Sequence, residues 1–352
     1  MQRLLSSLAL ASHEAVLLLN PSNMFYISGY TGEGAVFLVK DTGVVITDFR
    51  YTEQAEKQSP EFEVHMTEKG KVVQDVVDAL CIRFQIKEIY FESDFITVQD
   101  FEKYQSMVKG VTWKPIGSAV ETLREIKDAG ELALIEKACR ITGESFERIL
   151  PTIQEGMTEK ELALALEFDM RAHGADSVAF STIVAAGANG SLPHAVPSDY
   201  AIRRGDMITM DFGAKVGGYC ADMTRTVALG EPSAEMKKVY QTVKVAQEMA
   251  QDAVKAGKSC REVDAVARDY ITEQGYEGRF GHGLGHAVGI DVHESPRLNA
   301  LTESTLAAGH VVTVEPGIYL PGVGGVRIEN TVVVTESGCR TLTLPSRELI
   351  IL

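Results

Sequence analysis

Two apolar segments, about a hundred positions apart, each carry an acid where a strand would place a core side chain. The segment GDMITMDFG at 205–213 contains Asp211, and the segment GHVVTVEPG at 309–317 contains Glu315. A carboxylate that is buried without a partner loses several kcal/mol of hydration. Any fold for this chain must therefore supply partners to two separate buried acids.

Further motifs repeat in the same order. GGYCADMT and GGVRIENT both read Gly-Gly-x-x-x-acid-x-Thr, which aligns Asp222 with Glu329. LPHAV and LGHAV align His194 with His286, and the expected helix starts at 158 and 259 each have a glutamate three residues on. Several motifs in register indicate a duplicated half. Each half is expected to supply one histidine and two acids, so that the acids of one half meet those of the other across a pseudo-twofold axis.

Such a cluster predicts a metal centre. Four carboxylates in close proximity repel one another unless cations neutralise them, and two divalent ions balance their charge. An oxygen-rich set with one imidazole suits Mn²⁺ or Co²⁺, with Fe²⁺ and Zn²⁺ also compatible. Two bridging acids would hold the ions about 3.5–4 Å apart, as in two-metal hydrolases. The predicted ligands are Asp211, Asp222, His286, Glu315 and Glu329.

The hydrophobic pattern divides the chain into an α/β domain at 1–118, a linker at 119–127 and a second domain at 128–352. The second domain is expected to open with a helix capped by Asp128 and Glu131. In the first domain, short apolar runs alternate with a helical i, i+3, i+4 pattern. The expected strands lie at 15–19, 35–39, 44–47 and 88–92, and the expected helix at 71–84.

The charge and the cysteine content limit the functions and the cellular compartments that are compatible with this sequence. The formal net charge is −15 and no basic stripe is present, which argues against nucleic-acid and membrane-surface binding. Five scattered cysteines without a CxxC pair indicate free thiols in a reducing cytoplasm. No apolar run reaches the roughly 18 residues that a membrane span needs. The first residues favour an amphipathic helix over a signal peptide.

The motifs DFG…DMTR, GHGLGH, VHESP, EPG and RIEN resemble those of the proline-specific metallopeptidases, which include Xaa-Pro dipeptidase and aminopeptidase P. The segments NMFYISGYTGEGAVFLV and TDFRYTEQA are similar to the creatinase-like N-terminal domain of that family. The resemblance covers essentially the whole chain. It implies an α+β fold, with a pita-bread catalytic domain of duplicated halves preceded by a smaller α/β creatinase-like domain.

The resemblance also implies a role for each matched residue. Asp222 and Glu329 would bridge the two metals, Asp211 would complete one ion, and His286 and Glu315 would complete the other. Glu315 would also take the proton from the bridging water.

Four further residues match positions that contact the substrate. His194 and His293 would hold the substrate carbonyl and stabilise the tetrahedral intermediate, His282 would contact the substrate, and Arg327 would lie near the proline side. Taken without the resemblance, His293 is a capping or core-edge histidine. The alternative for Arg327 is that it only neutralises the bridging acids. Four other histidines are expected on the surface: His13, His65, His173 and His310, the last in a solvated turn.

The activity implied is that of an exopeptidase that cuts the Xaa-Pro bond of small peptides through a metal-bridging hydroxide. The resemblance further implies a homodimer. The short N-terminal domain favours a dipeptidase, and aminopeptidase P is the alternative. A non-catalytic binding module of the same fold is a more distant alternative, against which the intact ligand set argues.

Overall fold

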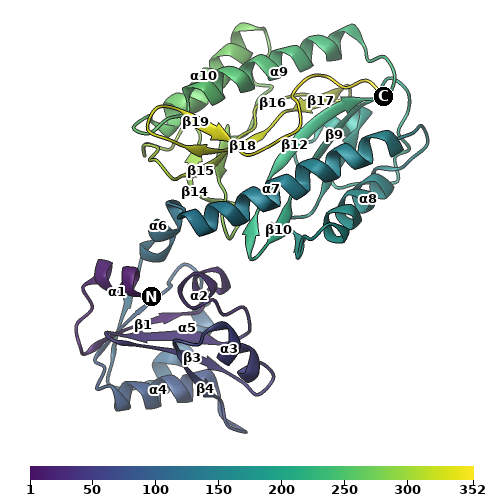
Figure 1. Cartoon of the computed structure of the whole chain (residues 1–352). Helices are drawn as coiled ribbons and strands as arrows, with labels where there is room; N and C mark the ends of the chain where they lie inside the picture. The colour runs from purple at the N-terminus through teal and green to yellow at the C-terminus, as the bar shows by residue number, and fades with distance from the viewer. The chain divides into compact units, whose positions relative to one another are not determined.

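The computed structural model describes residues 1–352. The chain forms two compact units, Met1–Arg124 and Glu125–Leu352, which Figure 1 shows from purple to blue and from teal to yellow. The segment 119–127, predicted as a linker, contains the short helix α6 (Ala119–Glu125). None of the helices combines the length and the apolar character that crossing a membrane would require.

The first unit is built on one six-stranded sheet with the order β4-β3-β2-β1-β5-β6. Strand β2 runs antiparallel to its neighbours β1 and β3. Strands β1, β5 and β6 are parallel to one another, as are β3 and β4. All four predicted strands are confirmed. The strands are β1 (Glu14–Leu18), β2 (Ala35–Val39), β3 (Thr42–Thr47), β4 (Glu63–Met66), β5 (Glu88–Phe91) and β6 (Thr112–Pro115).

Helices cover both faces of this sheet. Leu4 and Leu5 of the predicted first helix belong to one apolar core, whereas Val77 and Leu80 of the helix predicted at 71–84 belong to the other. Tyr104 of α5 lies in the same core as Val77. The helices of this unit before α6 are α1 (Gln2–Leu8), α2 (Pro21–Ser28), α3 (Thr52–Gln58), α4 (Val73–Arg83) and α5 (Val98–Met107).

The second unit contains two helix pairs. Asp128 and Thr158 form the predicted capping boxes, in which each side chain accepts a hydrogen bond from the glutamate N–H three residues on. Ser259 is also an N-cap, but its side chain makes no capping hydrogen bond. The helices are α7 (Ala129–Ile149), α8 (Glu159–Ala172), α9 (Ala234–Ala253) and α10 (Cys260–Glu273), with 3₁₀ turns η1 (Leu150–Thr152) and η2 (Gly187–Ser191).

The sheets of this unit carry the predicted repeat. The antiparallel order β8-β9-β12 in the first half matches β13-β15-β18 in the second. The first half contains β7 (Ser177–Val178), β8 (Ile183–Ala186), β9 (Met207–Phe212), β10 (Ala214–Val216), β11 (Tyr219–Cys220) and β12 (Met223–Ala228). The second contains β13 (Gly285–Ala287), β14 (Glu294–Leu298), β15 (Val311–Val314), β16 (Gly317–Leu320), β17 (Gly324–Arg327), β18 (Asn330–Val334) and β19 (Cys339–Thr341).

The predicted equivalence of His194 and His286 is wrong. When the acids Asp211 and Glu315 are aligned, the pairing of β8 with β9 and of β13 with β15 places Ala185 at the position of His286. His194 instead lies in a turn after η2. The two acids of each half therefore repeat in the structure, and the histidines do not.

A buried arginine joins the two halves. Arg225 of β12 is 2% exposed and donates to the carbonyl oxygen of Glu329 and to Asn330 Oδ1, the latter at 2.8 Å. It also donates to the carbonyl oxygens of Pro345 and Ser346, at 2.6 and 3.0 Å. Its removal would leave several buried acceptors without a donor.

We therefore expect Arg225→Met to lower the stability of the second unit by about 3 kcal/mol. In differential scanning calorimetry its transition should fall by at least about 6 °C. The control is Arg340→Met, because Arg340 is an exposed residue with one ion pair to Glu136. A surface pair of this kind contributes less than about 1 kcal/mol. An equal fall in the transition temperature of the two variants would contradict the role of Arg225 in joining the two halves.

Candidate metal centre

The four predicted acids lie at matching places in the two halves. Asp211 is near the end of β9, and Asp222 immediately precedes β12, the antiparallel partner of β9. Glu315 immediately follows β15, and Glu329 immediately precedes β18, the partner of β15. Each half thus presents two carboxylates from one pair of neighbouring strands.

Reciprocal hydrogen bonds connect these strand pairs. Thr224 Oγ1 donates to Glu329 Oε2 at 2.7 Å, and Thr331 Oγ1 donates to the carbonyl oxygen of Asp222 at 2.7 Å. The backbone N–H of Glu329 donates to the carbonyl oxygen of Thr224 at 3.1 Å. The two threonines are those of the repeated Gly-Gly-x-x-x-acid-x-Thr motif, to which the sequence alone assigned no role.

The donor atoms of Asp222, His286 and Glu329 lie within 4.8 Å of one another, and all three residues are buried. One oxygen each of Asp211, Asp222 and Glu329 is buried without a hydrogen-bond partner. Because a buried carboxylate oxygen without a donor is costly, three of them together require positive charge. The residues present therefore fit a divalent metal site.

The geometry of His286 fits the same site. Its Nδ1 lies 3.1 Å from the carbonyl oxygen of Ala287, which can only accept, so Nδ1 carries a proton. Its Nε2 lies 3.2 Å from Glu315 Oε1 and 3.6 Å from Asp222 Oδ2. A backbone acceptor on Nδ1 that leaves Nε2 facing carboxylates is the usual arrangement of a metal-binding histidine.

Electrostatics divide the acids into two kinds. Burial, together with the negative charge of its neighbours, raises the pKa of Asp222 well above its usual range, and the pKa of Glu329 rises for the same reasons. Burial alone would also raise the pKa of Glu315, but the hydrogen bond and charge of His286 lower it to about 2. Cations would therefore compete with protons for Asp222 and Glu329.

Arg327 supplies fixed positive charge beside the acids. It is 3% exposed, and its Nη2 donates to Asp211 Oδ2 at 2.6 Å. Its Nη1 donates to the hydroxyl of Tyr319 at 2.9 Å, and that hydroxyl lies 2.8 Å from His282 Nε2. Because His282 Nδ1 donates to the carbonyl oxygen of Gly283, Nε2 accepts a hydrogen bond from the Tyr319 hydroxyl. Tyr319 thus links the two predicted substrate-contacting residues, and no sequence motif indicated it.

One pocket of about 320 Å³ collects the predicted residues. Of the nine, only Glu329 is absent from its walls, and Phe180, Ile183 and Val292 add apolar surface. The eight predicted residues that line it are His194, Asp211, Asp222, His282, His286, His293, Glu315 and Arg327.

Two histidines lie at the exposed edge of this pocket. His194 and His293 are both exposed, and the His293 ring centroid lies 4.4 Å from that of His286. Burial, and then the charge of His286, lower the pKa of His293, which favours the neutral imidazole at neutral pH. A neutral imidazole there can donate one hydrogen bond to a molecule in the pocket.

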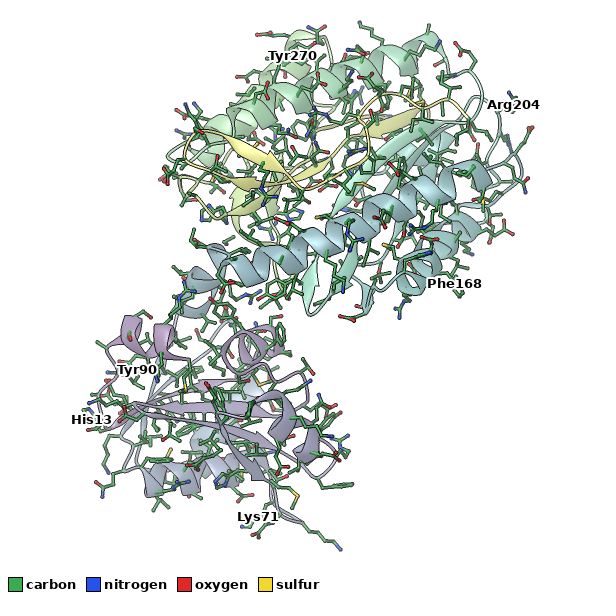
Figure 2. All side chains as sticks on the ribbon, in the orientation of Figure 1. His13, Lys71, Tyr90, Phe168, Arg204 and Tyr270 are labelled. Carbon is green, nitrogen blue, oxygen red and sulfur yellow. The ribbon has the colours of Figure 1, made fainter.

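The predicted solvated position of His310 is wrong. His310 is 4% exposed, its Nδ1 accepts a hydrogen bond from the Ala307 N–H at 3.1 Å, and burial lowers its pKa to about 4. Its side chain folds under the turn, with Nε2 3.8 Å from Glu125 Oε2. His13, labelled in Figure 2, and His173 are exposed, and His65 is half-buried.

A buried glutamate holds the turn that carries His194. Glu159 is completely buried and accepts hydrogen bonds from the N–H and hydroxyl of Ser198, at 2.9 and 2.6 Å. It also accepts from the Ala186 N–H at 2.7 Å and from Asn189 Nδ2 at 3.1 Å. Both ends of the segment 187–198 are therefore fixed to one carboxylate. Sequence reasoning missed Glu159 because an acid in the first turn of a helix is ordinarily a solvated residue.

Comparison with known proteins places the chain among metallopeptidases. Residues 133–336 match metallopeptidase family M24, and residues 1–126 match the creatinase/prolidase N-terminal domain. An uncharacterized peptidase of Bacillus subtilis, YqhT, is 43% identical over 96% of both chains. An Xaa-Pro dipeptidase from Bacillus anthracis has a TM-score of 0.95 at 41% identity, covering 100% of this chain and 98% of that one. An X-Pro aminopeptidase from Thermotoga maritima has a TM-score of 0.92 at 40% identity, covering 99% of each.

The chain belongs to metallopeptidase family M24 and is a hydrolase. The predicted fold, a creatinase-like N-terminal domain followed by a pita-bread catalytic domain, is confirmed.

We expect Glu159→Gln to loosen the segment 187–198. The donors of this segment share the two carboxylate oxygens of Glu159, whereas the amide of glutamine has only one acceptor oxygen. Hydrogen exchange of those backbone amides should become about tenfold faster, the effect of a weakened buried hydrogen-bond network. The matched control is Glu161→Gln, an exposed residue in the same helical turn. Unchanged exchange in the Glu159 variant would show that the carboxylate does not hold this segment.

Proposed function

We propose that this chain hydrolyses the bond before proline in small peptides, as an Xaa-Pro dipeptidase that uses two divalent metal ions. The observation that carries the proposal is the set of buried, donor-free oxygens of Asp211, Asp222 and Glu329 beside one pocket with exposed histidines at its edge. Its similarity to the Xaa-Pro dipeptidase of Bacillus anthracis supports the substrate class.

In this proposal Asp222 and Glu329 would hold both ions, Asp211 would complete the ligands of one, and His286 and Glu315 would complete those of the other. When bound, two such ions supply an activated water and polarise the carbonyl of the scissile bond. The oxygen-rich ligand set favours Mn²⁺ or Co²⁺, and it also permits Fe²⁺ or Zn²⁺.

The residues of the chain supply proton transfer and orientation. Glu315 Oε1 lies 3.2 Å from His286 Nε2, at the pocket wall, where its carboxylate can accept a proton. His194 and His293 lie where an imidazole N–H can donate to the carbonyl oxygen of the substrate. Hydrogen bonds of this kind stabilise negative charge as it develops on that oxygen.

Proline constrains how a substrate can be held. A bond to proline has no N–H, so the site must hold the peptide by its amine, its carbonyl and its ring. Phe180, Ile183 and Val292 offer an apolar surface to the ring, and Arg327 and His282 line the same pocket. A pocket of about 320 Å³ suits a dipeptide-sized molecule.

The second candidate is an aminopeptidase P that acts on longer peptides. The X-Pro aminopeptidase of Thermotoga maritima is similar to this chain to nearly the same degree as the dipeptidase. The short N-terminal domain is our reason for favouring the dipeptidase. A homodimer stays a prediction from the family resemblance, and a cytoplasmic location stays a prediction to which the five free cysteines lend support.

We expect Ala-Pro hydrolysis to cease after chelation and to return when Mn²⁺ or Co²⁺ is added, because the carboxylate cluster alone provides no activated water. Ala-Ala is the control substrate and should be cut much more slowly. A dipeptidase should prefer Ala-Pro to Ala-Pro-Ala-Ala, whereas the opposite preference would favour aminopeptidase P. No metal-dependent cleavage of either proline peptide would exclude both functions.

We expect His293→Ala to retain its bound metal and to lose about 10²-fold in kcat, the effect of removing a donor to the substrate oxygen. Metal content by elemental analysis and turnover of Ala-Pro are the two measurements. The exposed His13→Ala in the first unit is the control and should leave both unchanged. Near-normal turnover in the His293 variant would assign that residue a structural role only.

A further inference from the structure

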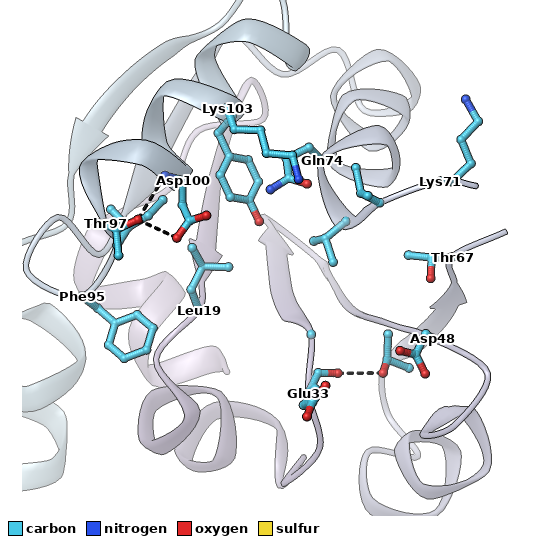
Figure 3. Close-up of a pocket in the computed structure, with 16 residues that line it drawn as sticks. Leu19, Glu33, Asp48, Thr67, Lys71, Gln74, Phe95, Thr97, Asp100 and Lys103 are labelled. Atoms are coloured by element: carbon cyan, nitrogen blue, oxygen red, sulfur yellow. Dashed lines mark hydrogen bonds between the residues drawn. The ribbon is translucent and has the colours of Figure 1, made fainter. Parts of the chain in front are cut away.

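Charged side chains line a pocket of about 670 Å³ in the first unit, but they do not select one class of ligand (Figure 3). Its walls carry acids and lysines together, and two of the acids share Arg50. These residues are Glu33, Asp48, Asp100, Lys71 and Lys103. A buried ion pair of the second unit, between Lys127 and Glu294, is more informative, because Glu294 directly follows His293 in the chain.

The pair between Lys127 and Glu294 is almost completely buried. Lys127 Nζ lies 2.9 Å from Glu294 Oε2, and the two side chains are 1% and 6% exposed. The ammonium otherwise reaches only the carbonyl oxygen of Glu125, at 3.4 Å. Because a buried charge that loses its partner is strongly destabilising, each side chain holds the other in one place.

The backbone fixes the lysine end of this pair. The Lys127 N–H donates to the carbonyl oxygen of Gly309 at 3.1 Å, in the turn before β15. The next residue, Asp128, is the N-cap of α7 and forms its capping box. Lys127 therefore presents its ammonium from a point that a helix start and a strand turn both determine.

The carboxylate of Glu294 lies inside the turn that carries His293. Its Oε1 accepts a hydrogen bond from the Asp291 N–H at 3.2 Å. A Cβ on Gly289 would collide with the same carboxylate, so only glycine lets the backbone approach it this closely. The turn thus closes around the acid, and Val292 and His293 within it line the pocket of the metal centre.

The start of the segment 289–294 is held by the first half of the unit. The Cys220 N–H donates to the carbonyl oxygen of Gly289 at 2.8 Å, and Lys215 Nζ donates to that of Ile290 at 2.9 Å. The ion pair of Glu294 supplies the anchor at the other end. Because His293 and Glu294 share a peptide unit, a displacement of the acid also displaces the histidine.

The placement of His293 is critical because its ring lies against a predicted metal ligand. The ring centroids of His293 and His286 are 4.4 Å apart. A group that acts on the reacting atoms can lose about 10²-fold in rate when it is misplaced by about 1 Å. Lys127 and Glu294 themselves do not line the pocket, so any effect they have on the reaction must pass through other residues.

We propose that Lys127 and Glu294 are positioning residues, whose buried ion pair holds His293 where it can donate to the carbonyl oxygen of the substrate. This inference rests on the proposed peptidase function, because it requires His293 to act on a bound peptide.

A double-mutant cycle with His293 tests the proposal in the full-length, metal-loaded protein. Lys127→Met and Glu294→Gln are each made in the wild type and in His293→Ala, and kcat and KM for Ala-Pro are measured. A residue that acts through His293 loses its effect once that ring is removed, whereas a residue that only supports the fold does not. Glu294→Gln preserves the size of the side chain and tests the pair even where Lys127→Met does not fold.

Three further measurements separate positioning from stability. Circular dichroism reports the fold, elemental analysis reports bound metal, and hydrogen exchange of the backbone amides of 289–294 reports the turn without any substrate. The control is Lys258→Met, which breaks a partly exposed ion pair of the same unit, 3.1 Å from Glu262. A surface pair of this kind contributes little to stability.

We expect Lys127→Met and Glu294→Gln each to lose about tenfold in kcat, with bound metal retained and KM changed by less than about twofold. In the His293→Ala background the same changes should lower kcat by less than about twofold. Exchange of the amides of 289–294 should become about tenfold faster, and Lys258→Met should change none of these values.

An equal loss of kcat in both backgrounds would overturn the proposal, since the pair would then support the fold alone. Loss of bound metal in the variants, or unchanged kcat in both, would overturn it as well. In each of these cases the wild type still cuts Ala-Pro, so the proposed function stands. A metal-loaded wild type that cuts no proline peptide would refute the proposed function and this inference together.

Discussion

The second unit depends on the need to neutralise negative charge at its centre. Four carboxylates approach one another from two antiparallel strand pairs, and three of them have a buried oxygen without a donor. Fixed groups of the protein meet only part of this need: Arg327 pairs with Asp211, and Thr224 donates to Glu329. Cations are the simplest way to supply the rest, and the surrounding hydrogen bonds hold the acids in place for them.

The two halves share their strand order but differ in what lies around the acids. The structural counterpart of His286 is Ala185, and the position of Glu159 at the start of α8 is taken by Cys260 at the start of α10. The residues that repeat in both halves thus provide the carboxylates. The residues that occur in one half only provide the histidines and the segments that hold them. A peptide is itself asymmetric, so its recognition requires residues that occur in one half only.

The sequence predicted what depends on repetition and periodicity. The acids were found because each recurs in a matching motif, and the strands of the first unit because their apolar runs are continuous. Tyr319 and Glu159 were missed because their roles depend on contacts with residues far apart in the chain, His282 and Ser198. The error for His194 arose because a short local match, LPHAV against LGHAV, was given the same weight as the strand motifs.

The central claim is that the carboxylates of both halves together hold two metal ions. Anomalous diffraction from crystals grown with Mn²⁺ tests it most directly, because it locates each ion relative to its ligands. The account predicts two anomalous peaks per chain, about 3.5–4 Å apart, each in contact with both Asp222 and Glu329. A single peak bound by the acids of only one half, or no peak at this cluster, would contradict it.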